Sequence, residues 1–360
     1  MPVALAPDDV VRTHEQGRAN EREPLLVIEP LLDFLRASGL DAPDDLTAEP
    51  IGDGHSNVTF ALSTGVVLRR PPRGPLPPSA HDVLREARLL RALAPTDVRT
   101  PKILAVCDDE HVISAPFYVM ELVEGEVITD SVPAALDDDA QRRRIADELI
   151  DGLVELHGAD WERLGLDGFG KPTGYLERQL RRFGGLWDHN RTRDLPEVAQ
   201  VGSWLAEHLP QSPPATIVHG DYRLGNTIYG PAAPAHLAAI LDWEMATIGD
   251  PLADLGYLTG TWTNPGESAD RLLGLSAVTA QPSFPVRREL AAWYADRSGL
   301  ALDDLAWYQA LALWKLAILL EASYRRFLTG TTSDAFFGEL ERGVPEIAEH
   351  ALEAARGGLL

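Results

Sequence analysis

The sequence has little positive charge and very few lysines. Lys and Arg total 32 against 55 Asp and Glu, which gives the 360-residue chain a formal net charge of -23. A surface of this sign repels nucleic-acid backbones and anionic lipids, so we expect no nucleic-acid and no membrane partner. The only lysines are Lys102, Lys171 and Lys315. Any role that needs a cationic side chain in the first hundred residues must therefore fall to arginine.

Cysteine is nearly absent as well. Cys107 stands alone and cannot form an internal disulfide, which fits a reducing compartment. The segment from Met1 to Asp9 lacks the basic start and apolar run of a signal peptide. The most apolar late stretch, Ala310 to Leu320, is interrupted by Lys315. These absences favour a cytoplasmic location.

The remaining composition, with 45% hydrophobic and 24% charged residues, is typical of a globular protein. The chain changes character twice. Residues 1–45 predict a helical extension with one helix over Ile28–Ala37, residues 46–123 favour strands, and residues 124–360 are mostly helical. We expect a small sheet-rich domain followed by a larger helical one.

Residues 46–123 predict a small antiparallel sheet with one helix. Two short β-branched runs flank the turn Ser63–Gly65 and predict a hairpin. The helix has its apolar stripe at Val83, Ala87 and Leu90. The strands are expected at Val58–Leu62, Val66–Arg69, Ile103–Cys107 and Pro116–Leu122.

Apolar residues at helical spacing predict most of the second domain. One compact strand-and-loop segment, Thr216–Asp242, separates the earlier helices from the later ones. The helices are expected at 140–157, Thr173–His189, Pro196–His208, Val286–Ser298, Leu302–Leu328 and Asp334–Arg356.

The strand-and-loop segment carries the most informative chemistry. An apolar run ending at Val218 leads to Asp221, Asn226 follows five residues later, and a second apolar run ends just before Asp242. Phosphoryl transfer needs such a set: oxygen ligands for a divalent cation and a carboxylate that accepts the proton of the attacking hydroxyl. Mg²⁺ keeps water and phosphate oxygens as ligands, so Asn226 and Asp242 suffice as its protein ligands, with Asp221 as the base.

Two alternatives apply to the same residues. Asp and Asn bond readily to nearby backbone, so His219, Asp221 and Asn226 could merely close a turn. A metallohydrolase centre built from His219, Asp221 and Asp242 would have few ligands nearby.

The motifs HGDYRLGN, LDWE and GDPLADLG resemble the aminoglycoside phosphotransferase and choline kinase-like families, relatives of the protein kinases. Their wording is similar to the branch whose kinase-like domain is attached to acyl-CoA dehydrogenases. The resemblance covers about residues 45–330 and implies an α+β, bilobal kinase-like fold. It further implies Mg²⁺, ATP with GTP not excluded, and transfer of phosphate to a hydroxyl of a small molecule.

The resemblance also implies a nucleotide site in residues 46–123. The turn containing Ser56 and Asn57 would approach the phosphates, and backbone groups from Glu121 to Val123 would bind the adenine edge. Arg69 would replace the family's usual Lys on the phosphates. Its neighbour Arg70 should point to the other face of the strand as a solvated charge.

Glu86, on the inward edge of its helix, is the partner that the resemblance implies for Arg69. The alternative for this residue is a surface acid on an arginine-rich helix.

In the catalytic segment the resemblance assigns four more residues. Arg223 would stabilise charge on the transferred phosphoryl group, with pairing to a nearby acid as the alternative. His219 would shape the loop. Asp250 and Asp254 would fix the loop backbone and cap the following helix.

A second function class is a nucleotide-binding, pseudokinase-like regulatory module without turnover, and the missing Lys favours it. The acceptor stays open between a hydroxyacyl-CoA-like molecule, an aminoglycoside-like molecule and other alcohols. Its specificity is expected from helices rich in aromatics, of which most should be core: Trp161, Tyr175, Trp187, Trp204, Trp262, Trp293, Trp307, Tyr308 and Trp314.

Overall fold

The structure is a computed structural model that describes residue 6 and residues 8–52, 57–74, 81–331, 335–357 and 359. The chain divides into two compact units, residues 1–123 and residues 124–360. We call them the N-terminal unit and the C-terminal unit and describe each by itself.

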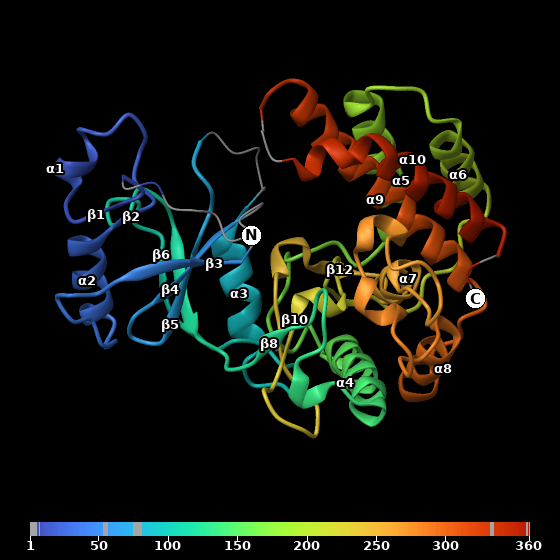
Figure 1. Ribbon diagram of the computed structural model, residues 1–360, viewed down its shortest axis with the longest axis horizontal. Coiled ribbons are helices and arrows are strands. Elements are labelled where there is room, and N and C mark those ends of the chain that lie inside the picture. Colours follow the sequence, from blue (N-terminus) through green and yellow to red (C-terminus); the bar gives the residue numbers. More distant parts are fainter. Residues whose placement is uncertain are drawn as a thin grey trace. The chain divides into compact units, whose positions relative to one another are not determined.

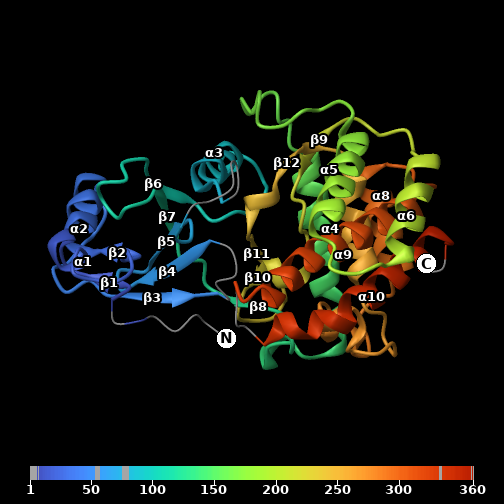
Figure 2. The same cartoon turned by 90° about the horizontal axis from the view of Figure 1, so that it is seen from above.

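The N-terminal unit is built on a five-stranded sheet with the strand order β3-β4-β5-β7-β6. All neighbouring strands are antiparallel. Helix α2 covers one face of the sheet and α3 lies on the other (Figures 1 and 2). The strands are β3 (Ala48–Ile51), β4 (Val58–Leu62), β5 (Val66–Arg70), β6 (Ile103–Cys107) and β7 (Phe117–Glu121); the helices are α2 (Ile28–Ala37) and α3 (Val83–Leu93).

Strand β5 shows how the two faces of this sheet differ. Side chains alternate along a strand, so Leu68 and Arg70 share one face while Val67 and Arg69 share the other. Leu68 packs in the core formed with α2. Arg69 is directed toward α3, where its Nε lies 3.0 Å from Glu86 Oε2.

The first residues of the chain form more than a helix. Strands β1 (Val10–Val11) and β2 (Leu26–Val27) pair in parallel, and α1 (His14–Gly17) connects them before α2. The sequence predicts a helical extension here and gives no sign of the two-residue strands.

Arg70 corrects an expectation. It is not a solvated charge, because its side chain is 2% exposed. The guanidinium donates hydrogen bonds to the carbonyl oxygens of Leu25, of Pro71 at 3.0 Å and of Ile113 at 3.2 Å. Burial lowers the pKa of Arg70 to about 10. The residues before β3 cover this face of the sheet, so Arg70 joins them to β5.

The C-terminal unit is mainly helical. Helix α9 packs against α7, α10 and α5, and Figure 1 shows α9 and α10 side by side. The short helix α7 is not among the predicted ones. The helices are α4 (Asp139–Gly158), α5 (Tyr175–Asn190), α6 (Pro196–Glu207), α7 (Leu252–Thr261), α8 (Arg287–Ser298), α9 (Leu305–Leu328) and α10 (Phe336–Ala355).

Two small antiparallel sheets lie among these helices, one with the order β11-β10-β8 and one that pairs β12 with β9. The strands are β8 (Glu126–Val127), β9 (Thr216–Val218), β10 (Thr227–Tyr229), β11 (Leu237–Ile240) and β12 (Thr247–Gly249). Short 3-10 turns are η1 (Ala134–Leu136), η2 (Leu224–Asn226), η3 (Trp243–Met245), η4 (Arg271–Gly274) and η5 (Ala277–Ala280).

Helix α9 is long and apolar enough to cross a bilayer by length and composition alone. However, 67% of its most apolar 18-residue window is buried inside the protein. Gly256 of α7 lies so close to it that an added Cβ would stand 2.5 Å from Tyr308 Cβ. The burial and the close approach are those of a core helix.

We expect Arg70→Met to weaken the N-terminal unit. The change leaves buried carbonyl oxygens without their donors, which costs about 2–4 kcal/mol of opening free energy. Hydrogen exchange of the β4, β5 and β7 amides measures this loss directly. Tryptophan fluorescence would not report it, because all eight tryptophans fall in the C-terminal unit.

The control is Arg12→Ala, since the Arg12 side chain is exposed where it pairs with Glu29 at 3.6 Å. Its effect should stay within about 0.5 kcal/mol. Equal protection in Arg70→Met and Arg12→Ala would contradict the anchoring role of Arg70.

Candidate active site

The strand pair β10 and β11 places two of the predicted residues at one edge. Thr227 pairs with Ile240, and Leu241 N–H donates to the Asn226 carbonyl oxygen at 2.8 Å. Asn226 stands just before β10 and Asp242 just after Leu241, so antiparallel pairing brings both to the same end of the ladder. The amide and the carboxylate predicted as metal ligands are therefore neighbours.

The backbone of Asp242 is unusual. Its φ of 62° and ψ of 64° lie in the left-handed region, where Asp and Asn are tolerated better than most residues. This conformation turns the chain out of the strand and into η3 immediately after it. A carboxylate is thereby presented at the strand end rather than within the sheet.

Asp221 lies in the loop between β9 and β10 and is held from several sides. Its Oδ2 accepts a hydrogen bond from Asn226 Nδ2 at 2.7 Å, and the same Nδ2 donates to the Asp221 carbonyl oxygen at 2.9 Å. Arg223 Nε lies 3.6 Å from Asp221 Oδ1, and both side chains are 24% exposed. Burial and the nearby charge of Asp221 raise the pKa of Tyr257. These contacts fix the Asp221 carboxylate while leaving it accessible.

His219 holds the loop through both ring nitrogens. Its Nε2 lies 2.8 Å from the Leu241 carbonyl oxygen, and Nδ1 accepts the Asp221 N–H at 3.2 Å. The ring packs 4.8 Å from the Trp243 ring. With both nitrogens engaged, His219 offers no lone pair to a metal, which removes the basis of the metallohydrolase alternative.

Asp254, at the start of α7, holds the loop backbone. Its Oδ2 accepts the His219 N–H at 2.7 Å and its Oδ1 accepts the Gly220 N–H at 2.8 Å. His157 Nε2 lies 3.2 Å from Oδ2, and His157 Nδ1 lies 2.8 Å from the Tyr294 hydroxyl. Burial alone would raise the pKa of Asp254, but the hydrogen bonds from His157 and Gly220 hold it below its ordinary value.

Asp250 has the second role expected for Asp250 and Asp254, which is to cap the helix that follows. Its carboxylate accepts the Leu252 N–H at 3.0 Å at the beginning of α7 and the Tyr308 hydroxyl at 2.8 Å. Burial raises the pKa of Asp250 despite these bonds. Asp250 thus caps α7 and ties it to α9.

In the N-terminal unit, Arg69 and Glu86 form an ion pair. The side chains are 13% and 2% exposed, so Glu86 is not a surface acid. Arg69 Nη1 also donates to Thr59 Oγ1 at 3.3 Å. A cation that is fixed on the α3 face by two partners from different elements is suited to gripping an anion there.

Of the other predicted nucleotide contacts, the structure describes Asn57, Glu121 and Val123. Ser56 lies outside the described residues, and Asn57, at the start of the hairpin, is buried. Glu121 ends β7, where its N–H donates to the Lys102 carbonyl oxygen at 3.0 Å and its Oε1 accepts the Lys102 N–H. Val123 N–H and C=O make no hydrogen bond among the described residues.

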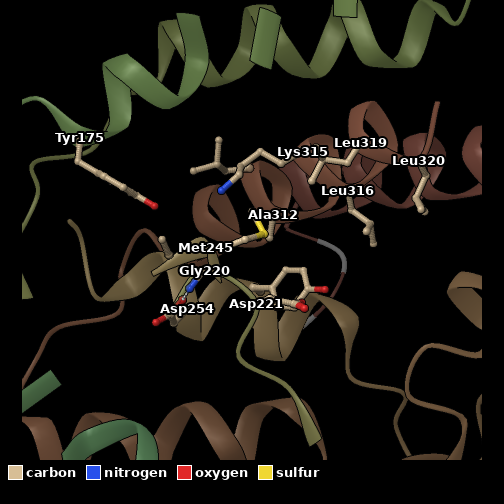
Figure 3. Close-up of a pocket in the computed structure, with 13 residues that line it drawn as sticks. Tyr175, Gly220, Asp221, Met245, Asp254, Ala312, Lys315, Leu316, Leu319 and Leu320 are labelled. Atoms are coloured by element: carbon tan, nitrogen blue, oxygen red, sulfur yellow. Dashed lines mark hydrogen bonds between the residues drawn. The ribbon is translucent and has the colours of Figure 1, made fainter. Parts of the chain in front are cut away.

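A pocket of about 190 Å³ lies in the C-terminal unit beside Asp221. Figure 3 shows its two walls, one from the loop with Gly220, Asp221 and Met245 and the other from α9. The α9 wall is apolar except for Lys315, which is partly buried. Burial lowers the pKa of Lys315 to about 8, with Asp254 and Asp221 opposing the shift.

Sequence reasoning missed most of this pocket. Of the nine aromatics expected to shape specificity, only Tyr175 lines it, and the apolar surface comes instead from leucines of α9. Tyr257 follows Asp254 by three residues, which places both near one face of α7. Lys315 had a visible signal, since it interrupts the most apolar stretch of the chain.

Comparison with known proteins decides the family. A model of the phosphotransferase enzyme family matches residues 47–293. The chain belongs to this family. Acyl-CoA dehydrogenase family member 11 of Gallus gallus is 35% identical over 324 residues, which are 86% of this chain and 40% of that protein. Family member 10 of Mus musculus is 34% identical over 303 residues, 82% of this chain and 28% of that protein. The chain thus spans less than half the length of these relatives.

Solved structures of phosphotransferases share the fold. A Ralstonia eutropha protein provisionally named an aminoglycoside phosphotransferase has a TM-score of 0.78 and 33% identity, covering 91% of this chain and 98% of its own. An aminoglycoside phosphotransferase solved with GDP and kanamycin has a TM-score of 0.62 at 18% identity, covering 89% and 97%. An aminoglycoside phosphotransferase solved with AMP-PNP and hygromycin B has a TM-score of 0.59 at 14% identity. The match covers 91% of this chain and 98% of that one. The expected α+β kinase-like fold is confirmed.

Lys315 should give the C-terminal unit a distinctive pH dependence. Below pH 8 the ammonium is charged in both states, and the folded state carries the cost of burying it. Between pH 8 and 10.5 the unfolded chain binds more protons, so this cost is relieved and stability rises. Lys315→Met should therefore be more stable than the parent by about 1–3 kcal/mol at pH 7, and the difference should shrink at pH 9.5.

Urea unfolding followed by tryptophan fluorescence measures this difference, because the tryptophans report on the C-terminal unit. The control is Lys171→Met. Lys171 is exposed, so this substitution removes the same charge without relieving a burial cost. A pH-independent difference between Lys315→Met and the parent would refute the burial cost.

Proposed function

We propose that the protein is a Mg²⁺-dependent kinase that moves the γ-phosphate of ATP to a hydroxyl of a small molecule, with Asp221 as the base. The observation that carries the proposal is the placement of Asp221. Its carboxylate is held by Asn226, stands on a loop whose backbone Asp254 fixes, and opens on a pocket. A base needs this combination of fixed position and access to the acceptor.

The donor set at the β10–β11 edge fits a magnesium ion. Asn226 uses its Nδ2 on Asp221, which directs the amide oxygen elsewhere, and Asp242 adds a carboxylate beside it. No group of three or more His, Cys, Asp and Glu side chains among the described residues could hold a metal. One amide and one carboxylate suit an ion that keeps water and phosphate oxygens as its remaining ligands. When bound, Mg²⁺ would neutralise charge on the β- and γ-phosphates.

The proposed step is an in-line transfer. The acceptor hydroxyl oxygen attacks the γ-phosphorus, the new O–P bond forms as the bond to the ADP oxygen breaks, and the acceptor proton passes to Asp221. Arg223, beside Asp221, stabilises the negative charge on the phosphoryl oxygens.

The N-terminal unit supplies the nucleotide contacts in this proposal. Arg69, steadied by Glu86, holds the phosphates in place of the usual Lys, and the turn with Ser56 and Asn57 covers them. The backbone of Glu121 and Val123 binds the adenine edge. ATP is the expected donor, and a solved fold neighbour carries its analogue AMP-PNP.

The acceptor is proposed as a small alcohol. Acyl-CoA dehydrogenase relatives favour a hydroxyacyl-CoA-like molecule, whereas kanamycin and hygromycin B in the fold neighbours favour an aminoglycoside-like one. The function requires no nucleic acid and no membrane, and the acidic chain suits a cytoplasmic enzyme of this kind.

Asp221→Asn and Asp242→Asn test the catalytic assignment. Each should lower ATP-dependent phosphorylation by at least about 10³-fold, since one removes the base and the other a charged metal ligand. ADP release is measured with hydroxylated acyl-CoAs, aminoglycosides and choline-like amines as acceptors, and without acceptor for slow hydrolysis.

Circular dichroism checks that both variants stay folded. Parental activity in purified Asp242→Asn would refute the metal assignment. Binding of ATP with Mg²⁺ in the parent, with no transfer to any acceptor and no hydrolysis, would favour the regulatory alternative instead.

Arg69 and Arg223 should separate binding from turnover. Arg69→Met removes a phosphate contact from the nucleotide site, so the Kd for ATP should rise about tenfold. Arg223→Ala removes charge stabilisation in the transition state, so kcat should fall about 100-fold while ATP affinity stays within about twofold. Titration calorimetry and steady-state kinetics on both variants measure the split, and equal losses of affinity and turnover in Arg223→Ala would contradict its role.

A further inference from the structure

The pocket beside Asp221 has one apolar wall that is continuous along α9. Leu311, Leu316 and Leu320 line it together with Ala312. The opposite wall carries Asp221 and Tyr257. A molecule that enters this pocket therefore has hydrocarbon on one side and the proposed base on the other.

Lys315 is the one cationic side chain among the 13 described residues that line the pocket. In Figure 3 its nitrogen is directed into the space between α9 and the loop with Gly220. The nitrogen lies 4.9 Å from the centre of the Phe183 ring. Among the described residues, no carboxylate lies within ion-pair distance of it.

This arrangement is costly in the empty protein. An ammonium next to hydrocarbon loses hydration, and a ring face replaces only part of it. The other two lysines, Lys102 and Lys171, are exposed. A methionine would fill the same volume in Lys315's place without this cost. The carboxylates of Asp254 and Asp221 offset part of this cost, and a ligand that brings a negative group next to the ammonium would offset more of it.

We propose that Lys315 selects the acceptor by charge: it binds an anionic group of an otherwise apolar alcohol and repels cationic acceptors. This inference rests on the proposed function, because it assigns the pocket to the acceptor. The leucines of α9 hold the hydrocarbon part, the ammonium holds the anion, and the hydroxyl lies toward Asp221.

Charge selection follows from the low polarity of the pocket. An anionic group that pairs with Lys315 replaces lost hydration on both partners. A cationic group in the same place meets a like charge in surroundings of low polarity, which is an effective means of rejection. An aminoglycoside, with several ammonium groups and little hydrocarbon, does not match the α9 wall with its leucines and its ammonium.

The test uses three probe alcohols that share one carbon chain and differ in charge: 6-hydroxyhexanoate, 1,6-hexanediol and 6-amino-1-hexanol. In the parent, kcat/KM for phosphorylation should be at least about tenfold higher for the anionic probe than for the cationic one. Lys315→Met should remove this preference, because it lowers kcat/KM for 6-hydroxyhexanoate and raises it for 6-amino-1-hexanol. Lys315→Glu should reverse it.

A binding arm makes the result independent of turnover. Hexanoate and hexylamine carry no hydroxyl, so titration calorimetry with each measures charge selection alone. In the parent and in Lys171→Met, hexanoate should bind at least about tenfold more tightly than hexylamine. In Lys315→Met, the two ligands should bind with equal affinity. Lys171→Met is the matched control because it removes an exposed lysine that does not line the pocket.

The outcomes separate the two ideas. Hexanoate selectivity that depends on Lys315, without phosphorylation of any alcohol, would support the inference and count against the proposed function. Equal binding of hexanoate and hexylamine to the parent, or unchanged selectivity in Lys315→Met, would overturn the inference even if the alcohols are phosphorylated.

Discussion

The pair of hydrogen bonds from the His219 and Gly220 amides to Asp254 is the constraint on which the loop with Asp221 depends. A loop of this kind has no ladder of its own, so its backbone groups need partners from elsewhere. Asp254 supplies them from the first turn of α7 and is itself held by His157 of α4. Three segments distant in the sequence thus fix one carboxylate, Asp221. The same constraint explains why Asp254 is ionised although it is buried: a carboxylate accepts hydrogen bonds at both of its oxygens, whereas the amide of an Asn in its place would accept at one oxygen only.

Much of the fold could be predicted because its elements have strong periodicity. The hairpin over Val58–Arg69 and the long helices repeat apolar residues at the spacing of a strand or a helix. Their predicted first and last residues differ from the observed ones by at most a few positions. Helix α7 was missed because its ten residues are nearly all buried and so show no polar face. The parallel pair β1 and β2 has two residues in each strand, too few for any pattern.

The two arginines of β5 show where sequence reasoning ends. Alternation correctly assigns Arg69 and Arg70 to opposite faces, because it is a local property of a strand. What covers each face is a long-range property, and the chain before β3 turned out to enclose Arg70. Lys315 is a similar case, since its place in an apolar stretch is visible in the sequence while the pocket that it faces is built by segments more than 50 residues away.

The left-handed backbone at Asp242 limits which residue types can occupy this position, whatever the side chain does in the site. Branched and bulky side chains are strained there, so the tolerated set is essentially Asp, Asn and Gly. Only one member of that set carries a charge. A lineage that loses the carboxylate can therefore change to Asn or Gly with little effect on folding, and such relatives of this protein should keep the fold and differ at this single position.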